Sequence, residues 1–200
     1  MKITVDHSVV KALLICAAKQ DVRYYLKGVL VDARANGDVV LVTTDGHRML
    51  AYPVATDAIE ALAPGQYIIP REALEAVKPC KAGRHVLPIT IEIDVAHGRE
   101  NKITGATSTV TPLIDGKYPD WRRVLPKTVS GEPTQYNPEY VSGFGDICKL
   151  LGGKYGPFIN YNGSSAAPVT NLGPALGVIM PLRVDGDDVK FSALPAWALA

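Results

Sequence analysis

Hydrophobic and polar positions follow the same order three times along the chain: a short strand, an amphipathic helix and then several strands. In the first stretch, residues 2–5 alternate as a strand does, and apolar side chains recur at helical spacing through residues 8–20, with Ser8 as the expected N-cap. Strands are predicted next, at residues 26–33, 39–44 and 48–54. The first two are joined by Asn36-Gly37-Asp38, which is typical of a hairpin turn.

The second and third stretches have a similar order. The second predicts a strand at 66–70, a helix from 71 to about 77, and strands at 89–95, 103–106 and 108–112. The third predicts a strand at 134–136, a helix at 137–151 that ends at a Gly-Gly pair, and strands at 158–161, 169–172 and 177–183. Three such β-α-β-β-β units predict an α+β fold with antiparallel sheets and helices on one face.

Composition is that of an ordinary globular protein, with 47% hydrophobic and 20% charged residues. No stretch approaches the roughly 18 consecutive apolar residues of a membrane span, and the first residues lack the apolar core of a signal peptide. The three cysteines, Cys16, Cys80 and Cys148, are odd in number and far apart. This argues against a disulfide framework and favours a cytoplasmic location.

The formal net charge of +1 is unevenly distributed. The last sixteen residues hold three aspartates against Lys190, a net of −2, so residues 1–184 carry +3. A basic bias of this size indicates a nucleic-acid partner only if the bases gather on one face.

Motifs for catalysis or metal binding fail on inspection. Residues 152–154 superficially suggest a phosphate-binding loop, but Cys148 occupies the position of the first glycine and Tyr155 replaces the Ser or Thr. No Cys-x-x-Cys or His-x-x-x-His spacing is present, and Asp115 and Asp120 flank a glycine in what reads as a loop. We therefore expect no enzymatic activity, no cofactor and no metal.

Five segments carry a resemblance to a known family. Residues 21–28 (Asp-Val-Arg-Tyr-Tyr-Leu-x-Gly), 44–48 (Thr-Asp-Gly-His-Arg) and Pro70-Arg71 are similar in order and spacing to the middle domain of the bacterial DNA polymerase III sliding clamp. Residues 115–126 resemble the segment that closes that domain, and residues 178–183 resemble the carboxyl terminus of the family. The resemblance implies the DNA-clamp fold.

The resemblance also implies a domain organisation. Residues 1–126 would form a middle-domain-like unit of two half-domains, residues 127–133 a linker, and residues 134–184 half of the last domain. The first domain of the family and the other half of its last domain have no counterpart. Residues 185–200 would be an added tail.

In the family, a hydrophobic groove between the middle and last domains captures short peptides of polymerases and of other replication and repair proteins. Met, Leu and Val would make such a groove adaptable, and the basic side chains would donate at its rim. Taken one at a time, these residues have ordinary structural explanations: a turn, a histidine whose hydrogen bonds are made within the protein, or the packed end of a strand. The resemblance assigns to the groove Leu26, Thr44, Gly46, His47, Met49, Pro119, Arg123, Val124, Val178, Met180, Pro181, Leu182, Arg183 and Val184.

Contact with double-stranded DNA is the second implied role, because helices of the family ring touch phosphates loosely. The alternative is that these side chains belong to solvated helix faces, and Glu72 stands where the family often has lysine. The resemblance places near the DNA path Gln20, Arg23, Tyr24, Tyr25 and Arg71. Further lysines fall in or next to the three helices: Lys11, Lys19, Lys78, Lys81, Lys149 and Lys154.

Two functions follow from the resemblance. One is a polymerase processivity factor in DNA replication, a homo-oligomer that encircles DNA. The other is a peptide-binding module without a ring, for example from a phage or mobile element, that recruits or competes for clamp-binding proteins. Half-domains of alternating type make up the family ring, and three half-domains per chain disturb this alternation. Whether this chain forms a closed ring is therefore left open. The apolar tail, with Phe191, Leu194, Pro195, Trp197 and Leu199, resembles a groove ligand in composition or else packs as a terminal strand.

Overall fold

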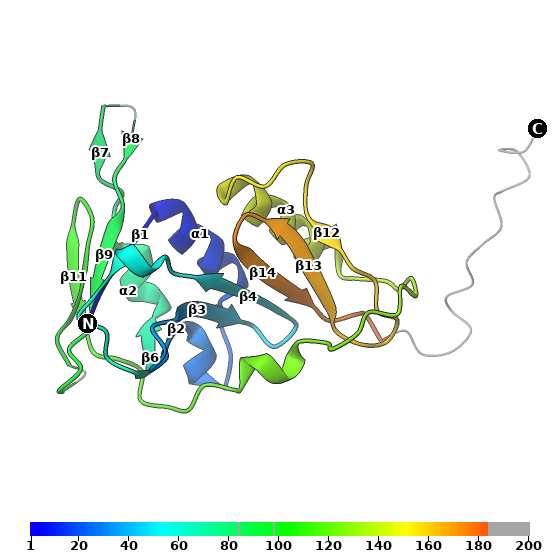
Figure 1. Ribbon diagram of the computed structural model, residues 1–200, viewed down its shortest axis with the longest axis horizontal. Coiled ribbons are helices and arrows are strands. Elements are labelled where there is room, and N and C mark those ends of the chain that lie inside the picture. Colours follow the sequence, from blue (N-terminus) through cyan, green and yellow to red (C-terminus); the bar gives the residue numbers. More distant parts are fainter. Residues whose placement is uncertain (84, 98, 184–200) are drawn as a thin grey trace, which may run out of the picture.

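Two antiparallel sheets and three α-helices carry most of the fold in this computed structural model, which describes residues 1–83, 85–97 and 99–183 (Figure 1). The helices are α1 (His7–Cys16), α2 (Arg71–Ala76) and α3 (Pro138–Leu150), with 3-10 turns η1 (Tyr24–Lys27), η2 (Thr56–Ala58) and η3 (Trp121–Val124). Within the described residues, no helix is long and apolar enough to cross a membrane.

The strands are arranged in two large sheets and one separate hairpin. The five-stranded sheet has the order β11 (Ser108–Thr111), β10 (Asn101–Thr104), β9 (Ile89–Glu92), β1 (Lys2–Val5) and β5 (Ile59–Glu60). The seven-stranded sheet has the order β12 (Phe158–Ile159), β13 (Ala167–Leu172), β14 (Ala175–Ile179), β4 (Arg48–Pro53), β3 (Val39–Thr44), β2 (Gly28–Ala33) and β6 (Gly65–Pro70). The hairpin consists of β7 (Lys81–Ala82) and β8 (His85–Val86).

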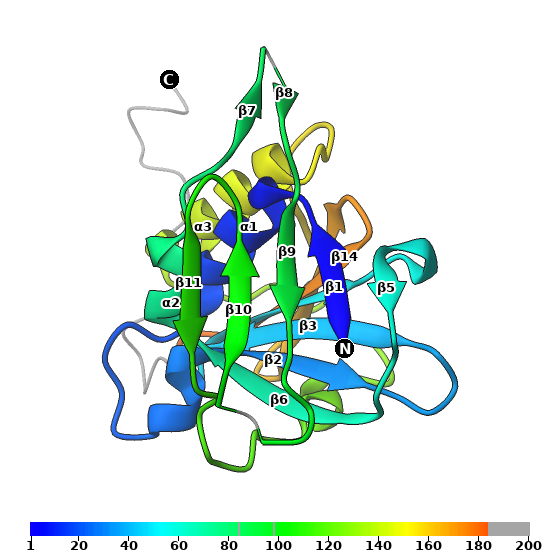
Figure 2. The same cartoon turned by 90° about the vertical axis from the view of Figure 1, so that its left-hand side faces the viewer.

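The first two units exchange their opening strands. Strand β1 pairs with β9 of the second unit, from Lys2↔Glu92 to Val5↔Ile89, and β6 pairs with β2 of the first unit. Figure 2 shows the five-stranded sheet facing the viewer with the helices behind it. Because each sheet contains a strand of the other unit, neither unit can bury its apolar face alone. The expected antiparallel α+β fold is confirmed.

The third unit extends the sheet of the first. Strand β14 pairs with β4 although the two are far apart in sequence, and helix α3 lies beside α1 (Figure 1). Phe144 of α3 is fully buried, and a Cβ added at Gly177 of β14 would come within 2.5 Å of its ring. Helix α3 is therefore packed directly onto the strand that joins the units.

Both faces of the seven-stranded sheet are covered, which explains why β2 is buried along its whole length. Successive side chains of a strand point to opposite faces. Val29 and Val31 accordingly join the larger core beneath the helices, whereas Leu30 joins a second core on the other face, with Trp121. This second core carries the candidate site.

Helix α1 is shorter than the sequence predicts. It begins at His7, with Asp6 rather than Ser8 at the N-cap position, and ends at Cys16 instead of residue 20. The end is fixed from outside, because the Arg71 guanidinium donates to the carbonyls of Leu14 (2.7 Å) and Ala17 (2.8 Å). These are carbonyl groups that a continued helix would bond internally.

Other elements differ at their ends. The predicted strand 26–33 begins as the turn η1, and strands 89–95, 158–161 and 177–183 are shorter than predicted. Residues 134–136 form no strand, although the Gln135 carbonyl accepts a hydrogen bond from the Leu182 backbone (2.8 Å). Strand β5 and the hairpin β7–β8 were not predicted, because strands of two residues show no periodicity. The predicted tail 185–200 lies outside the described residues.

We expect Phe144→Ala to lower the free energy of unfolding by about 3–5 kcal/mol, because it leaves a cavity between α3 and the sheet. Phe158→Ala is the matched control, since its ring is 55% exposed and its loss should cost less than about 1 kcal/mol. Urea unfolding followed by circular dichroism measures both. Equal losses in the two variants would contradict the packing described for α3.

Candidate functional site

A row of side chains crosses three neighbouring strands on the face opposite the helices. Thr44 of β3 is the direct cross-strand partner of Met49 of β4, and Met49 is the partner of Val178 of β14. Cross-strand partners lie on the same face of a sheet. Met49 (3% exposed) and Val178 (2% exposed) form the floor of a shallow groove, and Met180 (39% exposed) rises at its side.

The other side of the groove is the turn η3. Its Val124 is 42% exposed and lines the groove, while Trp121 of the same turn is packed into the core below. A buried carboxylate holds the turn in place: Asp32 of β2 accepts hydrogen bonds from Trp121 Nε1 (3.1 Å) and Arg122 Nη1 (2.6 Å). The Arg122 guanidinium also lies 4.0 Å from the centre of the Trp121 ring.

The charge on Asp32 is maintained by these partners. Burial alone would raise the pKa of its carboxyl, but the hydrogen bonds from Arg122 and Trp121 outweigh burial, and the pKa lies below its usual value. The groove wall therefore depends on an ionised aspartate.

The rim of the groove is the tight turn between β3 and β4. The Asp45 carboxylate accepts from the backbone of His47 (3.0 Å) and Arg48 (3.0 Å) and pairs with the Arg48 side chain (2.9 Å). Gly46 has φ +91°, a left-handed conformation that favours glycine in this turn.

Helix α3 supports this rim from the third unit. The rings of His47 and Tyr140 stack at 6.0 Å, and the Arg48 guanidinium lies 4.7 Å from the centre of the same tyrosine ring. The Met180 backbone donates to the His47 carbonyl (2.8 Å). The groove is thus formed jointly by the first unit, the third unit and the turn η3.

Half of the predicted groove residues line this groove together: Thr44, Gly46, His47, Met49, Val124, Val178 and Met180. Leu26 is buried beneath it, at 1% exposed. Arg48 also lines the groove and was missed, although its place between two predicted residues could have indicated it. The lining does not include Pro119, Arg123, Pro181, Leu182 and Arg183, and Val184 lies outside the described residues.

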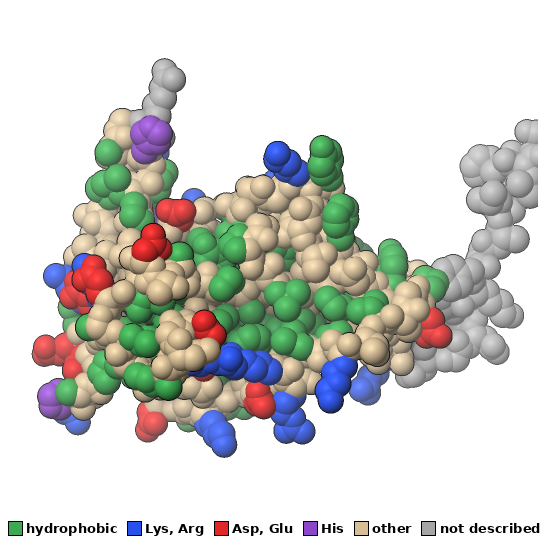
Figure 3. Space-filling view, viewed as in Figure 1, with side chains coloured by type: hydrophobic (Ala, Val, Ile, Leu, Met, Phe, Trp, Pro, Cys, Tyr) green, Lys and Arg blue, Asp and Glu red, His purple; other side chains and the backbone are tan. Residues whose placement is uncertain are grey.

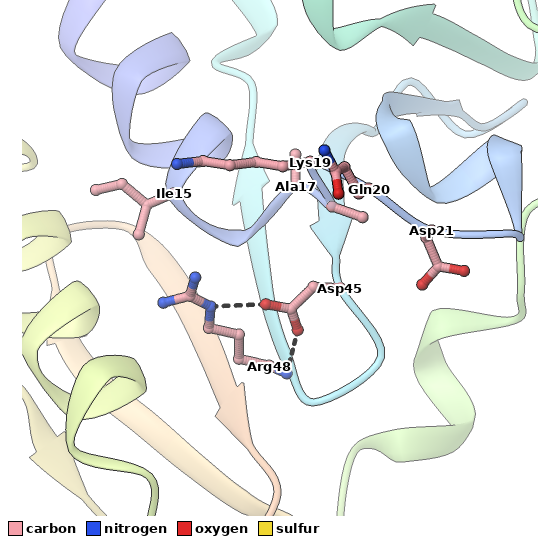
Figure 4. Close-up of a pocket in the computed structure, with 8 residues that line it drawn as sticks. Ile15, Ala17, Lys19, Gln20, Asp21, Asp45 and Arg48 are labelled. Carbon is pink, nitrogen blue, oxygen red and sulfur yellow. Dashed lines mark hydrogen bonds and ion pairs between the residues drawn. The ribbon is translucent and has the colours of Figure 1, made fainter.

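A second cavity lies at the end of α1, on the other side of the same turn. Figure 4 shows Lys19, Gln20 and Asp21 across from Asp45 and Arg48. Of the predicted DNA-facing residues, Gln20 lines this cavity. Asp45 and Arg48 therefore connect the cavity with the rim of the groove.

The neighbouring predicted residues lie on the loop that follows. The Arg23 side chain donates to both carboxylate oxygens of Asp21 (3.0 and 2.7 Å), and these hydrogen bonds lower the pKa of Asp21 to about 2. Tyr24 is 54% exposed, and its ring meets that of Tyr25 edge to face at 5.7 Å. This loop presents an arginine and an exposed aromatic ring to solvent.

Arg71, the remaining predicted DNA contact, is placed differently. It is 8% exposed, and its donors are directed to the carbonyls at the end of α1 and to Glu75 (2.7 Å). It holds α1 and α2 together rather than presenting its charge to solvent. Within the described residues, no group of three or more His, Cys, Asp or Glu side chains is arranged to hold a metal ion.

Solved structures with a similar fold define the class of this fold. The chain superposes on DNA polymerase III subunit beta from Borrelia burgdorferi with a TM-score of 0.67 and 13% identity, covering 92% of this chain and 65% of that one. It superposes on the Helicobacter pylori beta clamp, solved bound to a DNA ligase peptide, with a TM-score of 0.64 and 16% identity, covering 91% and 65%. At these identities the likeness shows the clamp fold alone.

Sequence comparison gives the family. The family described as DNA polymerase III beta subunit, central domain, matches residues 3–120. The beta sliding clamps of Salmonella typhimurium and Escherichia coli are 36% identical over 112 residues and 32% over 119 residues. The chain therefore belongs to the DNA polymerase III beta subunit family. The matches cover 55% and 59% of this chain but only 28% and 31% of those relatives.

We expect Asp32→Asn to lower the free energy of unfolding at neutral pH by about 2 kcal/mol, less than for a fully buried pair because Arg122 is 32% exposed. Since the folded pKa of Asp32 is depressed, its contribution is present above the unfolded value of about 3.9 and is lost as pH falls through the folded pKa. When unfolding is measured from neutral to acid pH, the stabilities of the wild type and the variant should therefore begin to approach each other below about pH 4 and meet only below the folded pKa.

Asp57→Asn, at an exposed aspartate, is the control. It should leave both the stability and its pH dependence unchanged. A variant Asp32→Asn as stable as the wild type at neutral pH would show that the carboxylate does not anchor the groove wall.

Proposed function

We propose that this protein is a sliding-clamp-like processivity factor of DNA replication whose groove captures short peptides of DNA polymerase and other replication or repair proteins. The observation that carries the proposal is the row Thr44–Met49–Val178, with Met180 and Val124 on either side. Two methionines and two valines offer an apolar surface that adapts to varied ligands. His47 and Arg48 at the rim can donate to a peptide backbone or carboxylate.

The rest of the predicted groove extends this surface. Leu182 (46% exposed) lies two residues after Met180. Arg183 comes directly after Leu182, Arg123 comes directly before Val124, and both arginines are exposed. The Helicobacter pylori beta clamp, whose fold this chain shares, was solved with a DNA ligase peptide. These features favour a peptide ligand that has apolar anchors and acidic or backbone groups to meet the basic side chains.

The proposal includes loose contact with double-stranded DNA. Gln20, Arg23, Tyr24 and Tyr25 would touch the backbone, and Arg71 would position the end of α1 from which that loop departs. We further propose that the chain acts in the cytoplasm as a homo-oligomer. The proposed units are residues 1–126, a linker 127–133, residues 134–184 as half of a clamp C-terminal domain, and a tail 185–200.

Met180→Ala should weaken binding of a fluorescein-labelled DNA ligase peptide of the kind bound by the Helicobacter pylori clamp by about tenfold, because one wall of the groove is removed. His47→Ala should weaken it as well, since the ring is stacked at the rim. Fluorescence anisotropy measures both affinities on the full chain.

Val110→Ala is the matched control, because Val110 is 62% exposed and lies outside the groove. It should bind the peptide like the wild type. If neither groove variant differs from this control, or if the wild type does not bind, the groove assignment is wrong.

If the chain forms a homo-oligomer, light scattering at micromolar concentrations should give a mass of at least twice the 21.4 kDa of one chain. An encircling oligomer should also be retained on closed circular DNA and lost after linearisation, because enclosure outlasts weak, salt-screened contacts. A monomer that still binds the peptide would instead support the peptide-binding module without a ring.

A further inference from the structure

The first two units have the same strand order, so each strand of one has a counterpart in the other. The order is β6, β2, β3, β4 in the first unit and β1, β9, β10, β11 in the second. Helix α1 contacts β4 as α2 contacts β11. Strand β4 pairs at its outer edge with β14, the third strand of the third unit, whereas β11 is the last strand of its sheet (Figure 2).

The other sheet edges are covered or short. Beside β6, the Ile114 backbone donates to the Ile68 carbonyl (2.8 Å). Beside β12, the Gly131 backbone donates to the Tyr161 carbonyl (3.0 Å), and Pro157 precedes the strand without an N–H. Strand β5 and the two strands of the hairpin have two residues each. Within the described residues, β11 is therefore the longest open edge.

This edge has none of the features that usually prevent pairing, which are charged residues, proline or a bulge. No charged residue lies between Lys102 and Asp115, and Pro112 comes only after the strand. The register of β11 with β10 shows no bulge, and Val110 is 62% exposed. The edge is thus a regular, uncharged template for another strand.

The outer face of the same sheet is charged, in contrast. Cross-strand partners form a row across it in the order Glu60, Lys2, Glu92, Lys102 and Val110. Figure 3 shows charged side chains along the side of the molecule where this sheet lies. The face is suited to water, so a partner strand would add to the edge.

The backbone groups at this edge point outward from two residues. The Gly105 backbone donates to the Thr107 carbonyl (2.9 Å) inside the β10–β11 hairpin. Pairs along an antiparallel ladder alternate between bonded and non-bonded, so the N–H and C=O of Thr109 face β10. Ser108 and Val110 therefore direct these groups to the open edge.

We propose that β11 pairs antiparallel with β11 of a second copy across a two-fold axis, so that the two five-stranded sheets join. Ser108 of each chain exchanges hydrogen bonds with Val110 of the other, and Thr109 faces its own copy at the axis. A register centred on Val110 would instead place Ser108 opposite Pro112, which has no N–H. The contact is isologous, so it joins two chains and does not by itself close a ring.

Charges beside α2 favour this arrangement. Glu72 in the first turn of α2 and Lys78 just beyond its end are exposed, and neither forms a salt bridge within the described part of the chain. A two-fold axis at Thr109 reverses the direction of the second α2. Glu72 of one copy is thereby brought toward Lys78 of the other, much as the pairing of β4 with β14 brings α1 beside α3.

Analytical ultracentrifugation of the full chain measures the dissociation constant of the dimer. The wild type should sediment with twice the 21.4 kDa of one chain. Val110→Lys should raise the dissociation constant about tenfold or more, because it adds a charge to the edge beside Lys102. Val129→Lys is the matched control, at a valine that is 46% exposed in the connection after η3, and should sediment like the wild type.

A charge exchange tests the contact between the two α2 helices. Glu72→Lys should raise the dissociation constant about threefold or more, because it places like charges together at the axis. Glu72→Lys/Lys78→Glu should restore the affinity of the wild type, since both pairs form again with their signs exchanged.

Thr109→Cys tests the register. Non-bonded antiparallel partners have Cα atoms about 4.5 Å apart, which a disulfide can span, so mild oxidation should give a covalent dimer on a non-reducing gel. Ser108→Cys is the control. Its two copies are out of register and more than about 7 Å apart, beyond the reach of a disulfide, although its side chain is the more exposed of the two.

The interface deepens the homo-oligomer included in the proposed function and rests on that part alone, since the groove lies on the other sheet. A wild type that binds the groove peptide but sediments as a monomer would overturn both the interface and the homo-oligomer. A dimer that is equally tight with Val110→Lys and Val129→Lys, or that Ser108→Cys links as fast as Thr109→Cys, would overturn the β11 interface alone.

Discussion

Pairing of β14 with β4 is the interaction on which the rest of the structure depends. It aligns Val178 with Met49 and so completes the apolar floor that β3 and β4 begin. It also brings α3 beside α1, where Tyr140 can support His47 and Arg48 at the rim. Because backbone hydrogen bonds fix the register, a slip of β14 by one residue would turn Val178 away from the groove, to the helix face.

Asp32 provides the second constraint on the groove. An aspartate in a fully buried strand is costly unless its oxygens are bonded, and here Trp121 and Arg122 supply those bonds. The burial cost and the hydrogen bonds together fix one position for η3, and with it Val124. The turn 45–48 then joins this groove to the cavity at the end of α1, and Arg48 lines both candidate surfaces.

Local signals predicted the elements well where a segment was long and periodic. Strand 39–44 matches β3, and helix 137–151 matches α3 with Asn137 as its cap. The end of α1 was wrong by four residues, because Arg71 terminates it through contacts that no local pattern contains. The hairpin β7–β8 was missed because two-residue strands have no period, although the basic run that it carries is visible in the sequence.

The sequence by itself determined the three helix-and-strand units and the antiparallel α+β class. Through its family motifs it also indicated which residues, distant from one another in sequence, would meet at one groove. Alternation and helical spacing depend on nearest neighbours along the chain, so they can be seen without a structure. Only the tertiary structure decided that Arg71 is a buried clamp, that Leu26 lies beneath the groove and that Arg48 lines it. Burial and hydrogen-bond partners come from segments far apart in sequence, and these are fixed only when the sheets and helices pack.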